Sequence, residues 1–397
     1  MTPSERRTSA ALASVFALRM LGLFMVLPVF ALEASRYPGG DDPAKVGLAM
    51  GVYGLAQALF QIPLGMASDR WGRKPVILAG LALFAAGSAL AAWAPTLDWL
   101  VVARTLQGAG AISAAVTALL ADLTRDSVRT KSMAMVGISI ALVFALSLVA
   151  SPWLAARIGL AGLFAMTAVL ALAGMTTVAW VVPPEPANRA PASRAGLARV
   201  LQDPGLLRLN LGVFVLHAVQ LAMWMGVPAL LVTAGLAKAD HWQVYLPAVV
   251  AAFLVMGSVL FRLERKGHLK AVFLVAIGLL LLAQLGLLAL SGAPSVWGLG
   301  LLLFCFFLGF NTLEASQPSL VSRLAPADAR GAALGVYNTL QSVGFFAGGA
   351  VGGWLAKTAG PLGLYSACAV LVTVWLVAAW GMQAPTVVKA DGAVTTA

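Results

Sequence analysis

One short charged segment interrupts the apolar part of the chain, and it reads Gly65-Met66-Ala67-Ser68-Asp69-Arg70-Trp71-Gly72-Arg73-Lys74. It fits the pattern G-x-x-x-D-R-x-G-R-K. Its glycines allow a tight turn and a close approach of the backbone, because glycine has no Cβ atom. Apolar stretches of roughly twenty residues flank it on both sides. The segment is therefore expected to be a charged connection between two apolar helices.

The composition of the whole chain places these helices in a membrane. Of the 397 residues, 60% are hydrophobic and 10% are charged, and the mean hydropathy is +0.91. A soluble globular protein has about 45–50% apolar and roughly 25% charged residues. This composition excludes a water-soluble enzyme, a nucleic-acid-binding module and a disordered linker protein. It predicts an all-α membrane protein that crosses the bilayer many times.

Twelve apolar windows are long enough to cross a bilayer. A hydrocarbon core about 30 Å thick needs ~20 helical residues per crossing, and backbone amides inside lipid must bond within their own segment. The windows are therefore expected to be helices rather than open strands. They fall at roughly 12–33, 44–66, 76–94, 97–121, 132–156, 161–182, 207–233, 241–262, 269–291, 295–321, 331–356 and 361–382.

The basic residues predict how these spans are oriented. With the N-terminus in the cytoplasm, nineteen of the 26 lysines and arginines fall on the cytoplasmic side, and five fall on the other side. Arg19 and Arg104 lie inside spans. This bias agrees with the positive-inside rule and with an even number of spans. The chain is expected in the cytoplasmic (inner) membrane, with both termini in the cytoplasm.

The two halves of the chain resemble each other. Val15–Arg19 is echoed by Val213–His217, and Leu123–Arg129 is echoed by Leu324–Arg330, in the same order. Such echoes indicate a duplicated six-helix unit, and parallel repeats of this kind place a substrate site near the midplane between the halves. The predicted units are an N-terminal bundle at 1–183, a cytoplasmic linker at 184–206, a C-terminal bundle at 207–383 and a short cytoplasmic tail at 384–397. No further soluble domain is expected.

A second motif lies in the fourth span. It reads Arg104-Thr105-Leu106-Gln107-Gly108-Ala109-Gly110-Ala111 and fits R-x-x-Q-G-x-G-A. With the charged connection between spans two and three, the chain resembles the major facilitator superfamily in its twelve-helix drug:proton antiporter branch. The resemblance implies two pseudo-symmetric six-helix bundles. Span five departs from the antiporter pattern, because Ala150-Ser151-Pro152 replaces a Gly-Pro pair, and this leaves uniport and uptake open beside exchange.

The resemblance gives the charged connection a gating role. It implies that Arg70 and Arg73 join Asp122 in a latch that holds the halves together on the inner face. Asp69 is placed to accept hydrogen bonds from the amides near Gly331 and Ala332, where the helix dipole favours an anion. The alternative is a set of ordinary positive-inside anchors. The predicted gating residues are Gly65, Asp69, Arg70, Gly72, Arg73, Lys74 and Asp122.

Four ionisable residues inside spans are candidates for proton coupling, because such groups are costly in lipid and usually serve a function. Glu314 is the first choice as proton carrier or cation anchor, with a fixed Arg partner as the alternative. The resemblance implies that Arg104 takes part in proton coupling or holds a cavity carboxylate, the alternative being bonds to backbone carbonyls. His217 can change charge near neutral pH, although a core histidine bonded to a carbonyl is the commoner outcome. Arg19 is its repeat partner.

The resemblance also implies that spans one, four, seven and ten line a central cavity. A few polar groups among aromatic side chains suit amphipathic organic molecules, and the same residues are equally compatible with core packing. Glu33, near the outer end of span one, is expected to be solvated. The predicted cavity residues, some from the neighbouring span two, are Phe24, Tyr53, Gln57, Gln107, Gln220, Trp224 and Asn311.

These observations predict a monomeric secondary transporter that couples protons to efflux of small amphipathic compounds by alternating access. One alternative is a transporter of a specific sugar or organic anion, with Arg19 and Arg104 binding the anion; another is a non-transporting sensor. The sequence has no P-loop and no catalytic or metal constellation, so neither enzymatic activity nor a cofactor is expected. The glycines of span eleven are interpreted as packing and bending positions: Gly344, Gly348, Gly349, Gly352 and Gly353.

Overall fold

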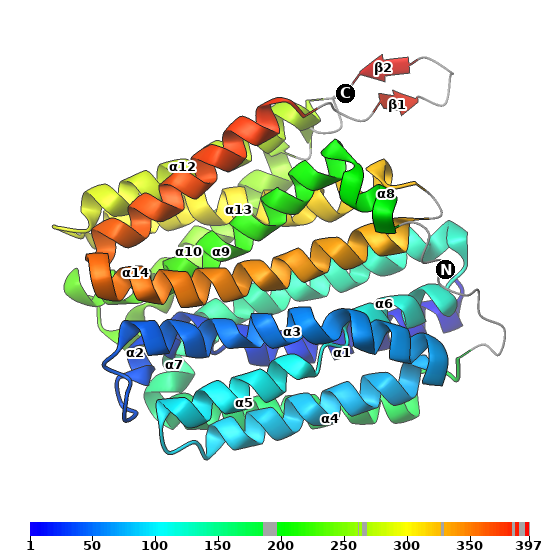
Figure 1. The fold of residues 1–397 in the computed structure, drawn as a ribbon, viewed down its shortest axis with the longest axis horizontal. Helices are drawn as coiled ribbons and strands as arrows, with labels where there is room; N and C mark the ends of the chain where they lie inside the picture. The colour runs from blue at the N-terminus through cyan, green and yellow to red at the C-terminus, as the bar shows by residue number, and fades with distance from the viewer. Residues whose placement is uncertain are drawn as a thin grey trace.

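The computed structural model describes residues 1–185, 197–260, 262–263, 268–326, 329–382, 386–388 and 394–396. Its long helices run side by side along the longest axis, and both chain ends lie at the same end of the molecule (Figure 1). We call this end the terminal end and the opposite one the far end. Much of the predicted linker, residues 186–196, lies outside the described residues.

The N-terminal part, up to residue 185, is entirely helical apart from its connections. Successive crossings, rather than successive helices, alternate in direction between the two ends of the molecule (Figure 1). They are α1 (Pro3–Phe24), α2 (Leu27–Ala34), α3 (Pro43–Trp71), α4 (Arg73–Ala92), α5 (Leu97–Ala109), α6 (Ser113–Asp122), α7 (Asp126–Thr176) and the π-helix η1 (Thr177–Val181).

The C-terminal part repeats this plan and ends in a small ribbon. Two strands pair antiparallel within the predicted tail, with Thr386 opposite Thr396. The elements are α8 (Leu197–Gln202), α9 (Pro204–Thr233), η3 (Lys238–Asp240), α10 (Trp242–Val255), η4 (Met256–Leu260), α12 (Leu269–Leu290), α13 (Val296–Leu324), α14 (Arg330–Trp380), β1 (Thr386–Val388) and β2 (Val394–Thr396).

Twelve crossings follow from ten apolar helical segments. The described residues contain ten segments that are long and apolar enough to span a bilayer, and α7 and α14 are each 51 residues long. A straight helix of that length would measure ~77 Å, more than twice a hydrocarbon core. Each is interrupted by one glycine with left-handed backbone, Gly159 (φ 65°) and Gly360 (φ 63°). Each long helix therefore contains two crossings, and the predicted number of spans is confirmed.

Two of the predicted single spans are each built from two helices. The span at 12–33 breaks after Phe24, because Pro28 lacks an amide hydrogen and its ring clashes with the carbonyl four residues earlier. The span at 97–121 breaks at Gly110. A Cβ atom there would lie 2.3 Å from the carbonyl oxygen of Gly80, so this position brings the chain against α4.

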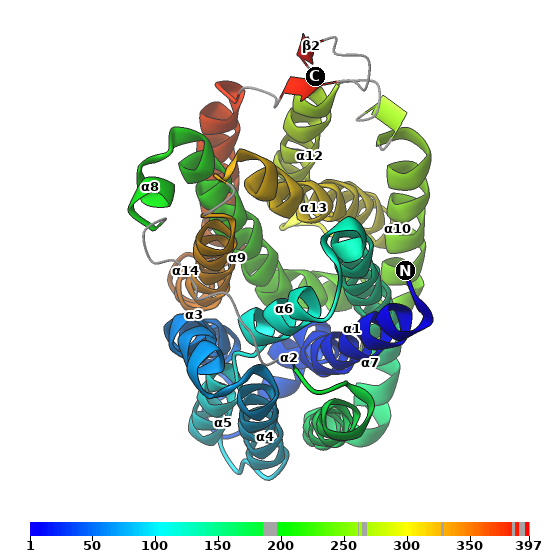
Figure 2. The same cartoon turned by 90° about the vertical axis from the view of Figure 1, so that its right-hand side faces the viewer.

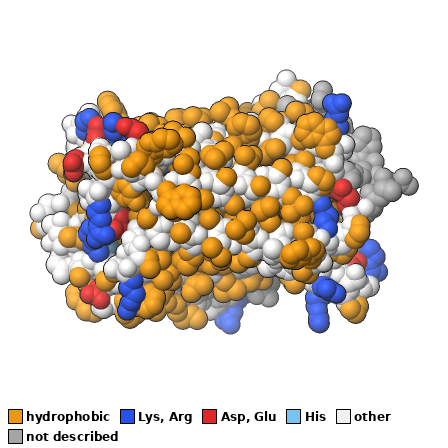
Figure 3. Space-filling view, turned by 90° about the horizontal axis from the view of Figure 1, so that it is seen from below, with side chains coloured by type: hydrophobic (Ala, Val, Ile, Leu, Met, Phe, Trp, Pro, Cys, Tyr) orange, Lys and Arg blue, Asp and Glu red, His pale blue; other side chains and the backbone are white. Residues whose placement is uncertain are grey.

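The outer surface is that of a protein embedded in lipid. A broad hydrophobic belt covers the middle of the molecule, and Lys, Arg, Asp and Glu gather at its two ends (Figure 3). Exposed tryptophans flank the belt, with Trp93 and Trp297 towards the far end and Trp180 and Trp380 towards the terminal end. Tryptophan is enriched at both membrane–water interfaces. The chain is thus a multi-pass membrane protein.

The two parts of the chain meet along α3 and α14. Seen from the terminal end, α1–α6 lie on one side and α9–α14 on the other, with α3 beside α14 (Figure 2). Towards the far end the contact is backbone against backbone. A Cβ atom on Gly349 would lie 2.5 Å from the oxygen of Gly47, and one on Gly353 would lie 2.8 Å from Cα of Gly47. The packing role predicted for the span-eleven glycines is confirmed at these positions.

Candidate functional site

The charged connection forms a compact turn at the terminal end. Helix α3 ends at Trp71 and α4 begins at Arg73, so Gly72 alone makes the turn, with φ 107°. The guanidinium of Arg73 forms ion pairs with Asp69 and, at 3.3 Å from Nε to Oδ2, with Asp122. It also donates to Ser68 Oγ at 2.8 Å. Three helices, α3, α4 and α6, are therefore joined by one arginine.

A carboxylate that the sequence did not single out completes this turn. Glu185 Oε2 accepts a hydrogen bond from the backbone amide of Arg73 at 2.6 Å, at the start of α4. An anion is favoured there, because the first amides of a helix carry partial positive charge. Lys74 Nζ donates to the carbonyl of Val182 at 2.8 Å. The turn is thus bound to the end of the sixth span, and the position of Glu185 just after that span was the available signal.

The expected latch between the halves is not formed by Asp69 in this conformation. Asp69 pairs with Arg73 instead of the amides near Gly331 and Ala332, and nothing lies within 4 Å of a Cβ built on Gly331. Arg70 is exposed. Gly65 faces Ala114, whose Cβ lies 3.7 Å from a Cβ built on the glycine. The latch therefore stays a prediction for another conformation of the protein.

Arg19 is the centre of a buried polar cluster in the N-terminal part. Only 1% of the residue is exposed. Its Nη2 donates to the Tyr53 hydroxyl at 2.6 Å and to Gln57 Oε1 at 3.2 Å, and its Nη1 donates to Ser113 Oγ at 3.4 Å. Its guanidinium carbon lies 5.4 Å from the ring centre of Phe84. Neutral oxygens and an aromatic face therefore surround this cation.

Arg104 lies over the ring of the same tyrosine. Its guanidinium carbon is 4.8 Å from the ring centre of Tyr53, within cation–π range. Its Nη1 donates to Gln107 Oε1 at 3.0 Å, and Gln107 Nε2 donates to Ser88 Oγ at 2.7 Å. The partner of Arg104 is thus a side-chain amide, rather than the carboxylate or backbone carbonyls that were expected.

A hydrogen bond connects this cluster to the C-terminal part. Gln57 Nε2 on α3 donates to Ser342 Oγ on α14 at 3.0 Å, and both residues are buried. Ser342 also donates to the carbonyl of Asn338 in its own helix. The sequence analysis missed Ser342, although a serine next to a glutamine in a glycine-rich apolar span was a visible signal.

His217 and Glu314 meet in the C-terminal part, and Gln341 joins them. His217 Nε2 lies 3.3 Å from Glu314 Oε2 and 2.7 Å from Gln341 Nε2. Gln341 Nε2 lies 3.4 Å from Glu314 Oε1. The imidazole Nδ1 lies 2.9 Å from the carbonyl oxygen of Val213. The carbonyl contact expected of a core histidine is therefore present at Nδ1, while the proton-coupling role of His217 stays a prediction. The partner of Glu314 is a histidine rather than an arginine.

The two members of this pair differ in exposure. The His217 side chain is 2% exposed, whereas the Glu314 side chain is 36% exposed. Glu314 Oε2 is nevertheless buried and accepts no hydrogen bond among the described residues. One carboxylate oxygen therefore lies buried against the imidazole, while the rest of the side chain is partly exposed.

Aromatic side chains from both parts of the chain pack beside this pair. Phe144 on α7 lies with its ring centre 5.1 Å from Phe24, 6.1 Å from Phe307 and 6.2 Å from Phe310. Phe310 in turn lies 5.8 Å from the ring of His217. Of the residues expected to line a cavity, Phe24 is partly buried and belongs to this group.

The remaining predicted cavity residues are enclosed. Trp224 is fully buried and packs edge-on against Tyr245, with ring centres 5.5 Å apart. Gln220 and Asn311 are 2% and 8% exposed, and each has a buried polar atom without a hydrogen-bond partner among the described residues. Trp224 is therefore part of the packed core in this conformation.

Two ion pairs join the parts at the far end. Lys357 Nζ lies 2.8 Å from Asp42 Oδ2, and Lys238 Nζ lies 3.8 Å from Glu33 Oε1. The hydrogen bond from Lys357 lowers the pKa of Asp42 below its ordinary value. Glu33 is 4% exposed and also pairs with Arg36 at 2.9 Å. The expectation that Glu33 is solvated was wrong, because Glu33 lies in the contact with the C-terminal part.

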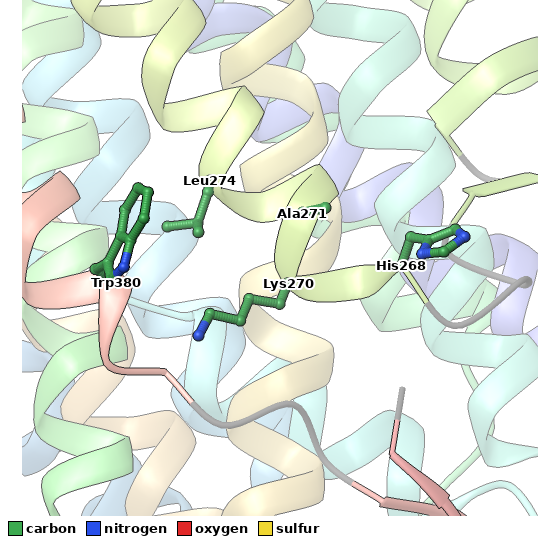
Figure 4. Close-up of a pocket in the computed structure, with 5 residues that line it drawn as sticks. All are labelled: His268, Lys270, Ala271, Leu274 and Trp380. Atoms are coloured by element: carbon green, nitrogen blue, oxygen red, sulfur yellow. The ribbon is translucent and has the colours of Figure 1, made fainter.

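A surface hollow of about 370 Å³ lies at the terminal end, apart from these clusters. It is lined by side chains at the start of α12 and the end of α14, namely His268, Lys270, Ala271, Leu274 and Trp380 (Figure 4). None of these residues belongs to the polar clusters between the parts. The hollow is shallow and open, so it adds nothing to the candidate site.

Sequence comparison relates the chain to known transporters. The profile of the Major Facilitator Superfamily matches residues 12–349. The inner membrane transport protein YajR of Escherichia coli (strain K12) is 42% identical over 389 residues, which cover 97% of this chain and 85% of YajR. The multidrug resistance protein MdtH of Aeromonas hydrophila is 29% identical over 350 residues, which cover 85% of this chain and 84% of MdtH.

Solved structures agree with this relation. A D-xylose-proton symporter superimposes with a TM-score of 0.73 at 16% identity, covering 95% of this chain and 97% of the symporter. The nucleoside transporter NupG superimposes with a TM-score of 0.71 at 15% identity, covering 94% of this chain and 99% of NupG. At such identities the two structures establish the fold alone. Because the profile covers most of the chain and YajR is similar over nearly all of it, the protein belongs to the Major Facilitator Superfamily.

Proposed function

We propose that this protein is a proton-coupled secondary transporter that exports small amphipathic organic compounds by alternating access. The observation that carries the proposal is the contact of His217 with Glu314 inside the membrane-spanning region, where the carboxylate has one buried and one accessible side. Ionisable groups at membrane depth are costly and usually serve a function. A histidine and a carboxylate in contact can share or exchange one proton.

The contacts between the two proposed halves, 1–183 and 207–383, support one pose of an alternating-access cycle. At the far end the halves are joined by Asp42–Lys357, Glu33–Lys238 and the glycine contacts of α3 with α14. At the terminal end the charged turn around Arg73 is engaged with Asp69 and Asp122 of its own half and with Glu185 just after that half. We place the terminal end in the cytoplasm of the inner membrane, following the basic residues, and this pose then faces inward.

The class of compound follows from the surroundings of the pair. Phe24, Phe144 and Phe310 contribute apolar surface from both halves, beside an acidic and a basic group. A few polar groups among aromatic side chains suit a ligand with an apolar body and one polar end. The relatives named multidrug resistance proteins agree with this choice. The transporter is proposed to act as a monomer.

One observation favours a second candidate, the transport of a specific organic anion. Arg19 and Arg104 are buried without a carboxylate partner among the described residues, and the Nε atom of each makes no hydrogen bond there. An anion entering between the halves would find two guanidinium groups. Flux of radiolabelled cationic, neutral and anionic compounds into proteoliposomes separates the two candidates by the charge of what is carried.

The proposal is tested by proton-driven flux in proteoliposomes that contain the purified protein. An imposed pH gradient should drive uptake of an amphipathic probe against its concentration gradient, and a pH-sensitive dye should record proton movement in the opposite direction. Glu314→Gln keeps the shape of the side chain but cannot ionise. Gradient-driven flux should therefore fall to the level of empty vesicles, while the variant folds and elutes like the wild type.

Asp98→Asn is the matched control, because it makes the same chemical change at an exposed far-end carboxylate paired only with Lys45. It should transport at the wild-type rate. Wild-type turnover by Glu314→Gln under the same gradient would remove Glu314 from the mechanism. Flux without proton movement in the wild type would refute proton coupling itself.

A further inference from the structure

Two neighbouring residues of α14 contact the two buried polar clusters, one each. Gln341 lies against His217 and Glu314 of the C-terminal part, and Ser342 accepts the hydrogen bond of Gln57 from the N-terminal part. Consecutive residues of an α-helix point ~100° apart, so one helix can face both clusters. Through Gln57 the second cluster continues to Arg19. Helix α14 is thus the physical link between the ionisable pair and the contact of the halves.

The contact of His217 Nδ1 determines whether the second ring nitrogen, Nε2, donates or accepts a hydrogen bond. Nδ1 lies 2.9 Å from the carbonyl oxygen of Val213, which can only accept, so Nδ1 carries a hydrogen in either charge state. In neutral imidazole Nε2 then has the lone pair and accepts from the amide of Gln341 at 2.7 Å. This arrangement leaves Glu314 Oε2 without a hydrogen bond among the described residues.

One added proton changes the role of Gln341, wherever that proton resides. If it binds His217, Nε2 becomes a donor to Glu314 Oε2, 3.3 Å away. If it binds Glu314, the new hydroxyl donates to the lone pair of Nε2. In both cases the proton occupies the gap between the two groups, so the amide of Gln341 loses its nearer acceptor, His217 Nε2, and retains the longer contact with Glu314 Oε1 at 3.4 Å. Gln341 must then rotate its amide or withdraw.

We propose that Gln341 is a positioning residue that senses the proton on the His217–Glu314 pair and, through Ser342, releases the hydrogen bond between α14 and α3. The inference rests on the proposed proton coupling and deepens it. N–H···O hydrogen bonds have donor–acceptor distances of about 2.7–3.2 Å and weaken steeply when they are misaligned. Because Gln57 Nε2 and Ser342 Oγ are 3.0 Å apart, a small shift or rotation of α14 takes this bond out of that range. Protonation then favours opening of the far end.

The other groups around the pair are consistent with this role. Phe310 of α13 and Phe345 of α14 cover the imidazole, with ring centres 5.8 and 4.9 Å away, and neither carries a proton that can exchange. Tyr337 of α14 is buried and close enough to Glu314 to interact electrostatically. In the part of the chain that the structure describes, the charged and titratable groups facing the pair are therefore its own two members and this phenol, with Arg19 lying beyond Ser342 and Gln57.

The experiment measures the far-end distance as a function of pH, without substrate. Spin labels on Pro95→Cys and Ala293→Cys occupy exposed far-end loops of the two parts, and both native cysteines are buried. In nanodiscs, the wild-type distance should increase between pH 8 and pH 5. Gln341→Leu should abolish this dependence. Ser342→Ala should also abolish it, while NMR titration of the labelled His217 ring keeps the wild-type midpoint.

Two matched controls remove the same kinds of polar group, a hydroxyl and a side-chain amide, at positions that lack the contacts of Ser342 and Gln341. Thr339→Val removes a hydroxyl of α14 that bonds only to its own helix, and Gln284→Leu removes a buried amide with no partner among the described residues. Both should respond to pH like the wild type. A wild-type response in Gln341→Leu or Ser342→Ala overturns the inference and leaves proton coupling intact. Absence of a pH response in the wild type overturns proton coupling and the inference together.

Discussion

Arg19 and Arg104 illustrate how individual charged residues are stabilised inside this protein. Each is almost fully buried, and in the described part of the chain each is surrounded by neutral acceptors and by the ring of Tyr53. A buried cation without hydrogen-bond partners would be very unfavourable. Tyr53 therefore has two tasks at once, because its hydroxyl accepts from Arg19 and its ring face attracts Arg104.

Tyr53→Phe separates these two tasks. The ring beside Arg104 remains, but Arg19 loses its shortest hydrogen bond, 2.6 Å long. Leaving a buried donor unpaired costs about 1–3 kcal/mol, so the variant should unfold at lower temperature in detergent, as recorded by tryptophan fluorescence. Tyr37→Phe is the control, because the Tyr37 hydroxyl makes no hydrogen bond among the described residues. Equal melting temperatures for the two variants would contradict this account of Arg19.

The sequence singled out the ionisable residues of the candidate site and some of their hydrogen-bond partners, Tyr53, Gln57 and Gln107, but missed others. Arg19, Arg104, His217 and Glu314 stand out because charges are rare in apolar spans. Ser88, Ser342 and Gln341 do not stand out, since an uncharged polar residue in a span is common and becomes informative only when two helices meet. Trp224 was predicted to line a cavity but is packed in the core. Sequence spacing places it on span seven but does not tell which neighbouring helix covers it.

The contact of helix α3 with helix α14 depends on glycines, which have no side chain. A Cβ atom on Gly349 would lie 2.5 Å from the oxygen of Gly47 and 2.7 Å from Cα of Gly51. These are backbone atoms and cannot turn aside as a flexible side chain can. Small residues of this kind let membrane helices approach closely.

Gly349→Ala should therefore separate α3 from α14 at the far end. We expect the variant to populate the far-end-open pose, to show a longer distance between spin labels on Pro95→Cys and Ala293→Cys, and to lose transport. Gly278→Ala on α12 is the control, because no described atom lies within 4 Å of a Cβ there and alanine is the better helix former. A wild-type label distance and wild-type flux in Gly349→Ala would show that this contact is not needed for closure.

The elements themselves were largely predictable from the sequence. All twelve spans follow from apolar length alone, because lipid leaves few alternatives to a helix. The break after Phe24 had a local cause in Pro28. Pro228 lies inside the continuous helix α9, however, so a proline alone does not predict where a span breaks. The break at Gly110 depends on the approach of α4 and therefore on tertiary structure.

Over the whole molecule, α3 and α14 are held together by two kinds of polar contact, one near the middle of the helices and one at the far end, and these are expected to respond differently to pH. The contact of Gln57 with Ser342 is tied through Gln341 to a histidine, the side-chain type that ordinarily changes charge between about pH 5 and 8. The pair Asp42–Lys357 behaves differently. Its hydrogen bond lowers the pKa of Asp42 below the ordinary 3.8, so its contribution is fully present above that value and is lost only as pH falls through the lowered pKa.

Lys357→Gln should therefore shift the far-end distance without changing its pH dependence. Lys357 is the partner to replace, because Asp42 also caps α3 by accepting from the amide of Ala44 at 2.9 Å. The labelled protein should be displaced towards the open pose by the same amount at every pH from 5 to 8, and high salt should reduce the difference, since the pair is partly exposed. Lys45→Gln, which removes an ion pair within one half, is the control. A pH midpoint that moves in Lys357→Gln would mean that the outer ion pair, and not the membrane-embedded histidine and carboxylate, governs opening.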